Sequence, residues 1–248
     1  MNGPANAHDS TSALPPSDGT TEGQATEHDQ PLLPKPLLRG RFHQVAFFVA
    51  IPAGAALVAA ARGSTARGSA IVYAVSLAAL FGTSALYHRR NWTARGRRVM
   101  RRLDHSMIFL LIAGTYTPFS LLVLPAPWSY VVLGVVWIGA ITGIALKVAR
   151  VDGFRVTTAV LYIGLGWLAL LTTRLVLEGL SGAGLFLMVA GGLLYTAGAV
   201  ILQRQSPDPS PRVFGYHEIW HSMVIGASAC HYALILGLVV GSRAVLAR

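Results

Sequence analysis

Seven long apolar stretches, separated by short polar segments, dominate this sequence after residue 41. They fall at about 42–61, 69–88, 105–124, 128–146, 156–173, 182–202 and 217–240. Each holds roughly 18 to 24 residues, enough for a helix rising about 1.5 Å per residue to cross a hydrocarbon core about 30 Å thick. None alternates polar and apolar residues as the strands of a membrane barrel do. The pattern therefore predicts an all-α integral membrane protein, a bundle of seven transmembrane helices.

The composition supports a membrane protein and sets the first residues apart. Hydrophobic residues make up 53% of the chain, charged residues only 12%, and the mean hydropathy is +0.54, values far from those of a soluble domain. Five of the ten acidic residues lie in the first 30 positions, among many Pro, Ser and Thr. We expect a disordered tail over 1–36, which lacks the pattern of a secretory signal peptide, a membrane domain over 37–243 and a short tail over 244–248.

The positive charges predict the orientation of the chain. Lys and Arg near helix ends are retained in the cytoplasm. With the N-terminus inside, 15 of the 20 Lys and Arg residues lie in inner segments, seven of them between Arg89 and Arg102. We therefore predict a multi-pass protein of the cell membrane with a cytoplasmic N-terminus and an external C-terminus. This topology and contact with membrane lipids explain the net charge of +10; nucleic acid is not expected as a partner, because no arginine run is interleaved with aromatic residues on a soluble fold.

Polar residues gather at the predicted cytoplasmic ends of three helices. They are Ser84 and His88 at the end of the second helix, Asp104 at the start of the third, and His217 and His221 at the start of the seventh. Residues four apart on a helix lie on the same face. Three segments that are remote in the chain thus deliver imidazole and carboxylate groups to one membrane depth.

Zinc suits this arrangement. Neutral imidazoles from different helices bind zinc at about 2.0–2.1 Å in a tetrahedral geometry. We predict that His88, His217 and His221 are the Zn²⁺ ligands and that the fourth position is open to water. Asp104 would hold that water or orient a ligand, and Ser84 would hydrogen-bond one turn away from His88. An open position is typical of a catalytic zinc site.

Other histidines and one glutamate admit more than one interpretation. A single histidine at a helix end often has no ligand role, and His105 is left out because it points about 100° away from Asp104. His231 lies roughly 21 Å deeper than His217, so we expect it to face a polar interior or a helix seam. Glu218 completes the letters HEIWH, in which a glutamate serves as general base in zinc proteases. We favour instead that Glu218 faces the aqueous boundary.

Several other residues predict helix packing and helix ends. The glycines of GAITG at 139–143 allow a close approach between helices. The fifth stretch is the least regular, because Gly164 and Gly166 interrupt it. Arg174 with Glu178 marks its predicted end.

As a set, these motifs resemble those of the hemolysin III family. They are S-x3-H before an arginine-rich segment, L-D-H at the third helix and H-x3-H at the last. The family is the bacterial branch of the progestin and adipoQ receptors, placed with alkaline ceramidases in a superfamily of proposed membrane hydrolases. The resemblance covers about 37–243. It implies zinc ligands at His88, His217 and His221, a water-positioning aspartate at Asp104 and a serine of the same cluster at Ser84, and it argues against a catalytic Glu218.

The resemblance leaves three hypotheses for the function. The first is a zinc-dependent hydrolase of a lipid amide or ester, in which Asp104 accepts a proton from a zinc-bound water whose pKa is lowered to about 7. The second is a non-catalytic membrane sensor or regulator whose zinc is structural. The third is a pore-forming cytolysin, which we rank last because the spans lack the repeated polarity of a water-filled channel.

Overall fold

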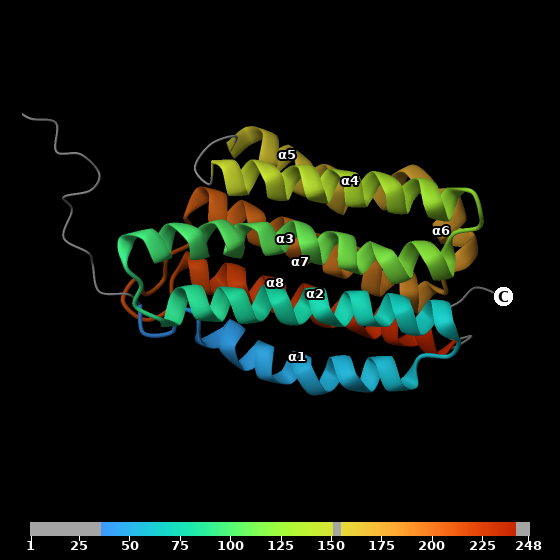
Figure 1. Ribbon diagram of the computed structural model, residues 1–248, viewed down its shortest axis with the longest axis horizontal. Coiled ribbons are helices and arrows are strands. Elements are labelled where there is room, and N and C mark those ends of the chain that lie inside the picture. Colours follow the sequence, from blue (N-terminus) through green and yellow to red (C-terminus); the bar gives the residue numbers. More distant parts are fainter. Residues whose placement is uncertain (1–35, 151–154, 242–248) are drawn as a thin grey trace, which may run out of the picture. The chain divides into compact units, whose positions relative to one another are not determined.

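The structure, a computed structural model, describes residues 36–150 and 155–241. Over these residues the regular elements are all helices (Figure 1), and seven of the helical segments are long and apolar enough to cross a membrane. The predicted all-α, seven-helix fold class is therefore confirmed. The predicted N-terminal tail over 1–36 lies outside the described residues except for residue 36. The predicted C-terminal tail over 244–248 also lies outside them.

Six of the seven spans are continuous helices, and five of these agree with the predicted stretches to within about one or two turns. The six are α1 (Arg41–Ala60), α2 (Ser64–Arg89), α3 (Ala94–Val123), α4 (Trp128–Ala149), α7 (Gly182–Arg204) and α8 (Tyr216–Val240). Length and apolar character are thus enough to locate these helices, because a helix in lipid must satisfy its own backbone groups.

The third helix departs from its prediction. We expected it to begin at residue 105, but α3 begins at Ala94, where the hydroxyl of Thr93 caps it by accepting a hydrogen bond from the Gly96 N–H at 3.2 Å. The arginines of 95–102 therefore lie in helical turns rather than in a loop, since arginine is a good helix former. As a consequence Asp104 lies nearly three turns inside α3 instead of at its start.

The fifth span is divided into three helical pieces. These are α5 (Arg155–Gly166), the 3₁₀ segment η1 (Leu168–Thr172) and α6 (Thr173–Gly179). The α-helix stops at a glycine, a residue with low helix propensity. The hydroxyl of Tyr116, on α3, bridges the break by donating to the Gly166 carbonyl at 3.1 Å and accepting from the Ala169 N–H at 3.0 Å.

The predicted end of this span is wrong. We placed it at residue 173, with Arg174 and Glu178 beyond it, whereas the apolar helical segment runs over Val160–Gly179. Both charged residues lie within α6 and pair one turn apart, with 2.9 Å between Arg174 Nε and Glu178 Oε1. The pair is exposed, so its charges do not require the helix to stop.

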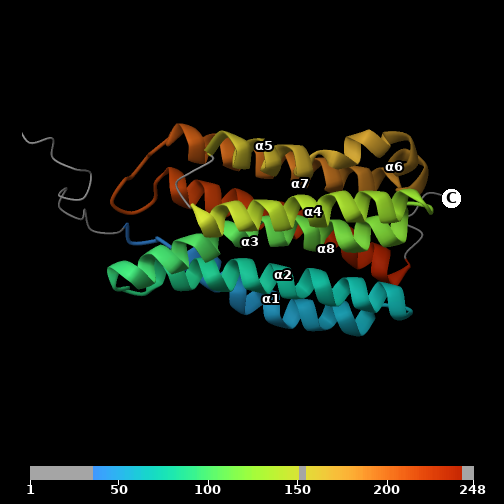
Figure 2. The same ribbon diagram turned by 45° about the horizontal axis from the view of Figure 1, so that its top comes forward.

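The helices run back and forth (Figures 1 and 2). Sequential neighbours pack side by side from α1 to α4, and α7 packs beside α8. The end of α2 and the starts of α1, α3 and α8 meet at one end of the bundle, on the left in Figure 1. There the segment before α1 pairs with the segment before α8, because Leu37 N–H donates to the Arg212 carbonyl at 3.0 Å and Leu38 N–H to the Val213 carbonyl at 3.3 Å. This pairing holds the beginnings of the first and last spans together.

Glycines allow close helix contacts, as predicted for GAITG. A Cβ on Gly139 would lie 2.7 Å from a methyl carbon of Leu165, and one on Gly143 would overlap the ring of Phe109. Small residues let helix backbones approach in a membrane. The packing of α4 against α3 and α5 therefore depends on these two positions.

Candidate metal centre

The three predicted histidine ligands converge at one end of the bundle. His88 lies in the last turn of α2, and His217 and His221 lie in the first two turns of α8. One ring nitrogen of each residue can be chosen so that all three lie within 4.8 Å of one another. The structure thus brings together side chains that are 129 positions apart in the chain.

The spacing of two of these rings fits tetrahedral zinc. His88 Nε2 and His217 Nε2 are 3.3 Å apart. Two nitrogens that each lie 2.0–2.1 Å from one zinc ion at a tetrahedral angle would be separated by about 3.3 Å. The same separation is long for a hydrogen bond between nitrogen atoms.

His221 supplies a second test of the fit. Its side chain is fully buried, and neither Nδ1 nor Nε2 has a hydrogen-bond partner among the described residues. Leaving a buried polar group without a partner costs roughly 1–3 kcal/mol. A metal ion bound by this ring would remove that cost, so the residues present fit a zinc ion.

His43 is part of this site, and the sequence prediction missed it. It lies in the first turn of α1, is 2% exposed, and stacks on His221 with 3.7 Å between ring centroids and 11° between ring planes. The ring of Phe81 packs edge-on against His43, with 5.1 Å between ring centroids. The sequence did contain a signal for it. Like His88, His217 and His221, His43 lies at the predicted cytoplasmic end of an apolar stretch.

Glu218 does not face water, so the interpretation favoured from the sequence is wrong. Its side chain is fully buried, with 2.5 Å between Arg39 Nε and its Oε1, while its Oε2 accepts the Gly215 N–H at 2.9 Å. The first N–H groups of a helix lack intrahelical acceptors and attract a carboxylate. Glu218 therefore caps α8 and anchors Arg39 of the segment before α1, and its two oxygens are already engaged.

Asp104 and Ser84 are both buried and bond to each other. The hydroxyl of Ser84 donates to the carboxylate of Asp104, which links α2 to α3. Ser84 lies one helical turn from His88 on α2. The carboxylate is therefore held close to the histidine-bearing end of α2, although Asp104 is not a member of the three-histidine group.

Of the other histidines, His105 lies close enough to His217 to interact with it electrostatically, and His231 lies further along α8. The backbone carbonyl of His105 accepts from the Tyr162 hydroxyl at 3.1 Å. His231 lies between α8 and α7, with its Nε2 3.4 Å from the Met188 carbonyl oxygen. On the same stretch of α8, Ser228 Oγ lies 2.9 Å from the Tyr195 hydroxyl. The prediction that His231 faces a helix seam is confirmed.

Comparison with known proteins gives consistent matches. Residues 32–232 match a family model described as Haemolysin-III related. Hemolysin-3 of Bacillus cereus is 35% identical over 197 residues, covering 78% of this chain and 87% of the relative. The Hemolysin-3 homolog of Bacillus subtilis (strain 168) is 34% identical over 166 residues, covering 66% and 74%. The human Monocyte to macrophage differentiation factor is 26% identical over 172 residues, covering 67% and 68%.

Proposed function

This chain belongs to the haemolysin III-related family, and we propose that it is a zinc-dependent membrane hydrolase that cleaves an amide or ester bond of a lipid. The observation that carries the proposal is the convergence of His88, His217 and His221 from two helices, with 3.3 Å between two of their ring nitrogens. Three protein ligands and one open position are typical of catalytic zinc.

The carboxylate that a hydrolase would use is that of Asp104, which is buried and whose partner Ser84 lies one helical turn from His88. A bound zinc ion would polarise a carbonyl oxygen and lower the pKa of its water to about 7. The Asp104 carboxylate would accept the proton of that water and later return it to the leaving group. Ser84, by donating to Asp104, would hold the carboxylate in one orientation, and the apolar helices around it would admit a lipid.

A second function is a non-catalytic sensor or regulator in which the same metal is structural. The full burial of His221 and its stacking on His43 favour this alternative, because a metal enclosed by packed rings would tie α8 to α2 and α1. Both functions require the same three ligands. They differ in the need for the Asp104 carboxylate.

The Asp104→Asn variant separates the two functions. Purified protein in detergent would be tested for zinc content and for hydrolysis of a panel of lipid amides and esters. The catalytic function predicts normal zinc and folding with a loss of turnover of at least about 10²-fold, the typical contribution of a general base.

A matched control is Asp208→Asn, which changes an aspartate of the α7–α8 connection that accepts the Tyr216 N–H at 3.0 Å. This variant should keep its turnover. Full turnover in Asp104→Asn would reject the catalytic role, as would a wild-type protein that binds zinc and cleaves none of the lipids.

A further inference from the structure

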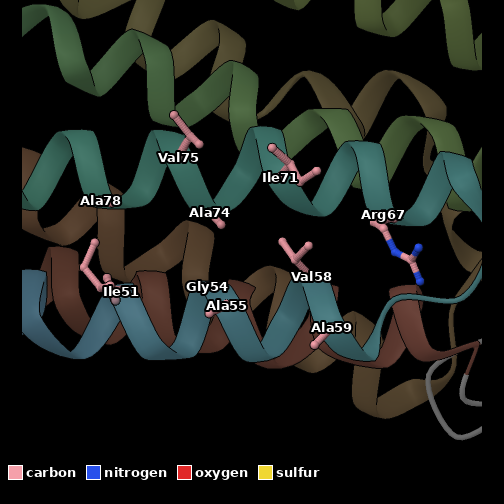
Figure 3. Close-up of a pocket in the computed structure, with 11 residues that line it drawn as sticks. Ile51, Gly54, Ala55, Val58, Ala59, Arg67, Ile71, Ala74, Val75 and Ala78 are labelled. Carbon is pink, nitrogen blue, oxygen red and sulfur yellow. The ribbon is translucent and has the colours of Figure 1, made fainter.

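A groove runs along the lipid-facing side of the α1–α2 pair, away from the histidines. It is largely open on its outer side, and its volume is about 530 Å³. The two helices lie close together at Gly54, where a Cβ would lie 2.9 Å from the Ala74 Cβ. Its sides include Ile51, Ile71 and Val75, which are 51%, 46% and 61% exposed (Figure 3).

The groove matches one leaflet of the membrane in length. Its lining residues on α2 run from Arg67 to Ala78, a rise of about 16 Å along the helix. Half of a hydrocarbon core about 30 Å thick is about 15 Å. His88 lies roughly 30 Å from Arg67 along the same helix, so the groove belongs to the leaflet opposite the histidine group.

Arg67 places a positive charge at the outer end of this apolar groove. It lies in the first turn of α2 and is exposed, and its side chain extends toward the space between the two helices (Figure 3). Within 36–150 and 155–241, no carboxylate forms an ion pair with it. A guanidinium group is well suited to bind a phosphate through paired hydrogen bonds.

We propose that this groove is a phospholipid-binding site, with one acyl chain between α1 and α2 and the lipid phosphate on Arg67. The apolar sides, the length of one leaflet and the cation at the water-facing end together match such a lipid. A second copy of the chain is a poorer occupant, because a two-fold axis along the membrane normal would bring two Arg67 side chains to the same depth. Like charges at that depth would repel each other.

Photolabelling of the full chain tests the proposal. The protein would be reconstituted in phosphatidylcholine vesicles containing a small fraction of a phospholipid with a diazirine in one acyl chain. After irradiation, the labelled residues would be mapped by mass spectrometry. Labels should concentrate on 50–59 and 67–78 over another exposed apolar face, that of α4 around Ile138 and Ile141, which are 69% and 60% exposed.

Two matched pairs of variants give the test its controls. Ala55→Phe fills the groove, whereas Ala56→Phe changes the next exposed alanine, which does not line it. Arg67→Gln removes the cation, whereas Arg62→Gln changes another exposed arginine, which lies in the connection between α1 and α2. A diacylglycerol probe with the same acyl chains but no phosphate serves as the comparison. The ratio of phospholipid labelling to diacylglycerol labelling should fall about fivefold in Arg67→Gln, because one cation near the surface contributes roughly 1 kcal/mol to phosphate binding.

Each outcome of these experiments either supports or overturns the proposal. The site is supported if Ala55→Phe loses the labels in the groove and Arg67→Gln loses the preference for the phospholipid probe. The control variants Ala56→Phe and Arg62→Gln should behave like the wild type. Even labelling over α1, α2 and α4 in the wild type overturns it, and so does unchanged labelling in Ala55→Phe. Crosslinks between copies through the α1–α2 face would also overturn it, since a second chain would then occupy the groove.

Discussion

His221 shows at the scale of single residues why the histidine group needs a ligand. Both ring nitrogens are buried without hydrogen-bond partners among the described residues, and the ring lies against His43 and near His88 and His217. A cluster of imidazoles in an apolar bundle costs free energy unless a cation joins them. Around the cluster lie packed side chains and a partly buried ion pair between Arg39 and Glu218.

Removing a proposed ligand should remove the metal. We expect wild-type protein to hold about one zinc ion per chain, since a three-ligand site holds a single ion, and expect His217→Ala and His221→Ala to lose most of it. Their thermal unfolding midpoints in detergent should fall and no longer respond to added zinc, because metal binding contributes to the folded state. Elemental analysis checks the content, with His231→Ala as the control that keeps its zinc. Full zinc in both ligand variants would refute the assignment.

Replacing Glu218 should affect stability rather than chemistry. Glu218→Gln can still accept the Gly215 N–H but leaves the partly buried Arg39 without its counter-charge. We expect a loss of roughly 2–3 kcal/mol in the free energy of unfolding, with zinc content and turnover per folded molecule preserved. Glu178→Gln, which breaks an exposed pair of the same type, should leave the unfolding midpoint nearly unchanged. A stable but inactive Glu218→Gln protein would instead indicate a catalytic glutamate.

The divided fifth span illustrates what matters at the scale of helices. Lipid cannot satisfy the backbone groups freed by a break, so the Tyr116 hydroxyl takes over by bonding Gly166 and Ala169. In α4, by contrast, glycines do not interrupt the helix, and their lack of a side chain lets α3 and α5 pack closely against it. Helix contacts in this bundle therefore depend on a few positions at which a larger side chain does not fit.

A pair of glycine substitutions on one helix tests this dependence. A Cβ at Gly143 would overlap the Phe109 ring, whereas one at Gly134 would meet no atom within 4 Å. Gly143→Ala should destabilise the protein by about 1–3 kcal/mol through overpacking. Gly134→Ala should be neutral or stabilising by up to about 1 kcal/mol through helix propensity. Unfolding in detergent followed by circular dichroism measures both, and equal midpoints for the two variants would contradict the packing argument.

For the whole molecule, the arrangement of chain ends decides where the candidate site lies. The starts of α1, α3 and α8 and the end of α2 share one end of the bundle, and backbone hydrogen bonds join residues 37–38 to 212–213 there. The assignment of this end to the cytoplasm stays a prediction from the distribution of Lys and Arg. The proposed lipid groove lies in the other leaflet.

Two truncations of this chain test which N-terminal residues the bundle needs. A protein lacking residues 1–35 should insert into membranes and bind zinc normally, because the described contacts of the first span begin at Leu37. A protein lacking residues 1–40 should be less stable, since it loses Arg39 and the pairing with 212–213. Zinc content and unfolding midpoint of the two proteins provide the comparison, and equal behaviour would show that this pairing is dispensable.

The sequence by itself determined the class of fold, the number of spans and the three converging histidines. Hydrophobic length is a local property, and helix periodicity places His217 and His221 on one face without knowledge of their neighbours. Local patterns could not locate the start of α3 or the break and end of the fifth span, because arginine-rich turns, glycines and an exposed ion pair are compatible with either a loop or a helix.

Only the tertiary structure decided which groups surround the histidines. His43 stacks on His221 and Glu218 binds Arg39 across 178 and 179 positions of the chain, and no spacing rule connects residues that far apart. The same is true of the groove between α1 and α2, whose lining includes Gly54 of one helix and Ala74 of the other. The physical reason is that burial and charge pairing depend on which helices become neighbours, whereas membrane insertion depends mainly on each segment's own hydrophobicity.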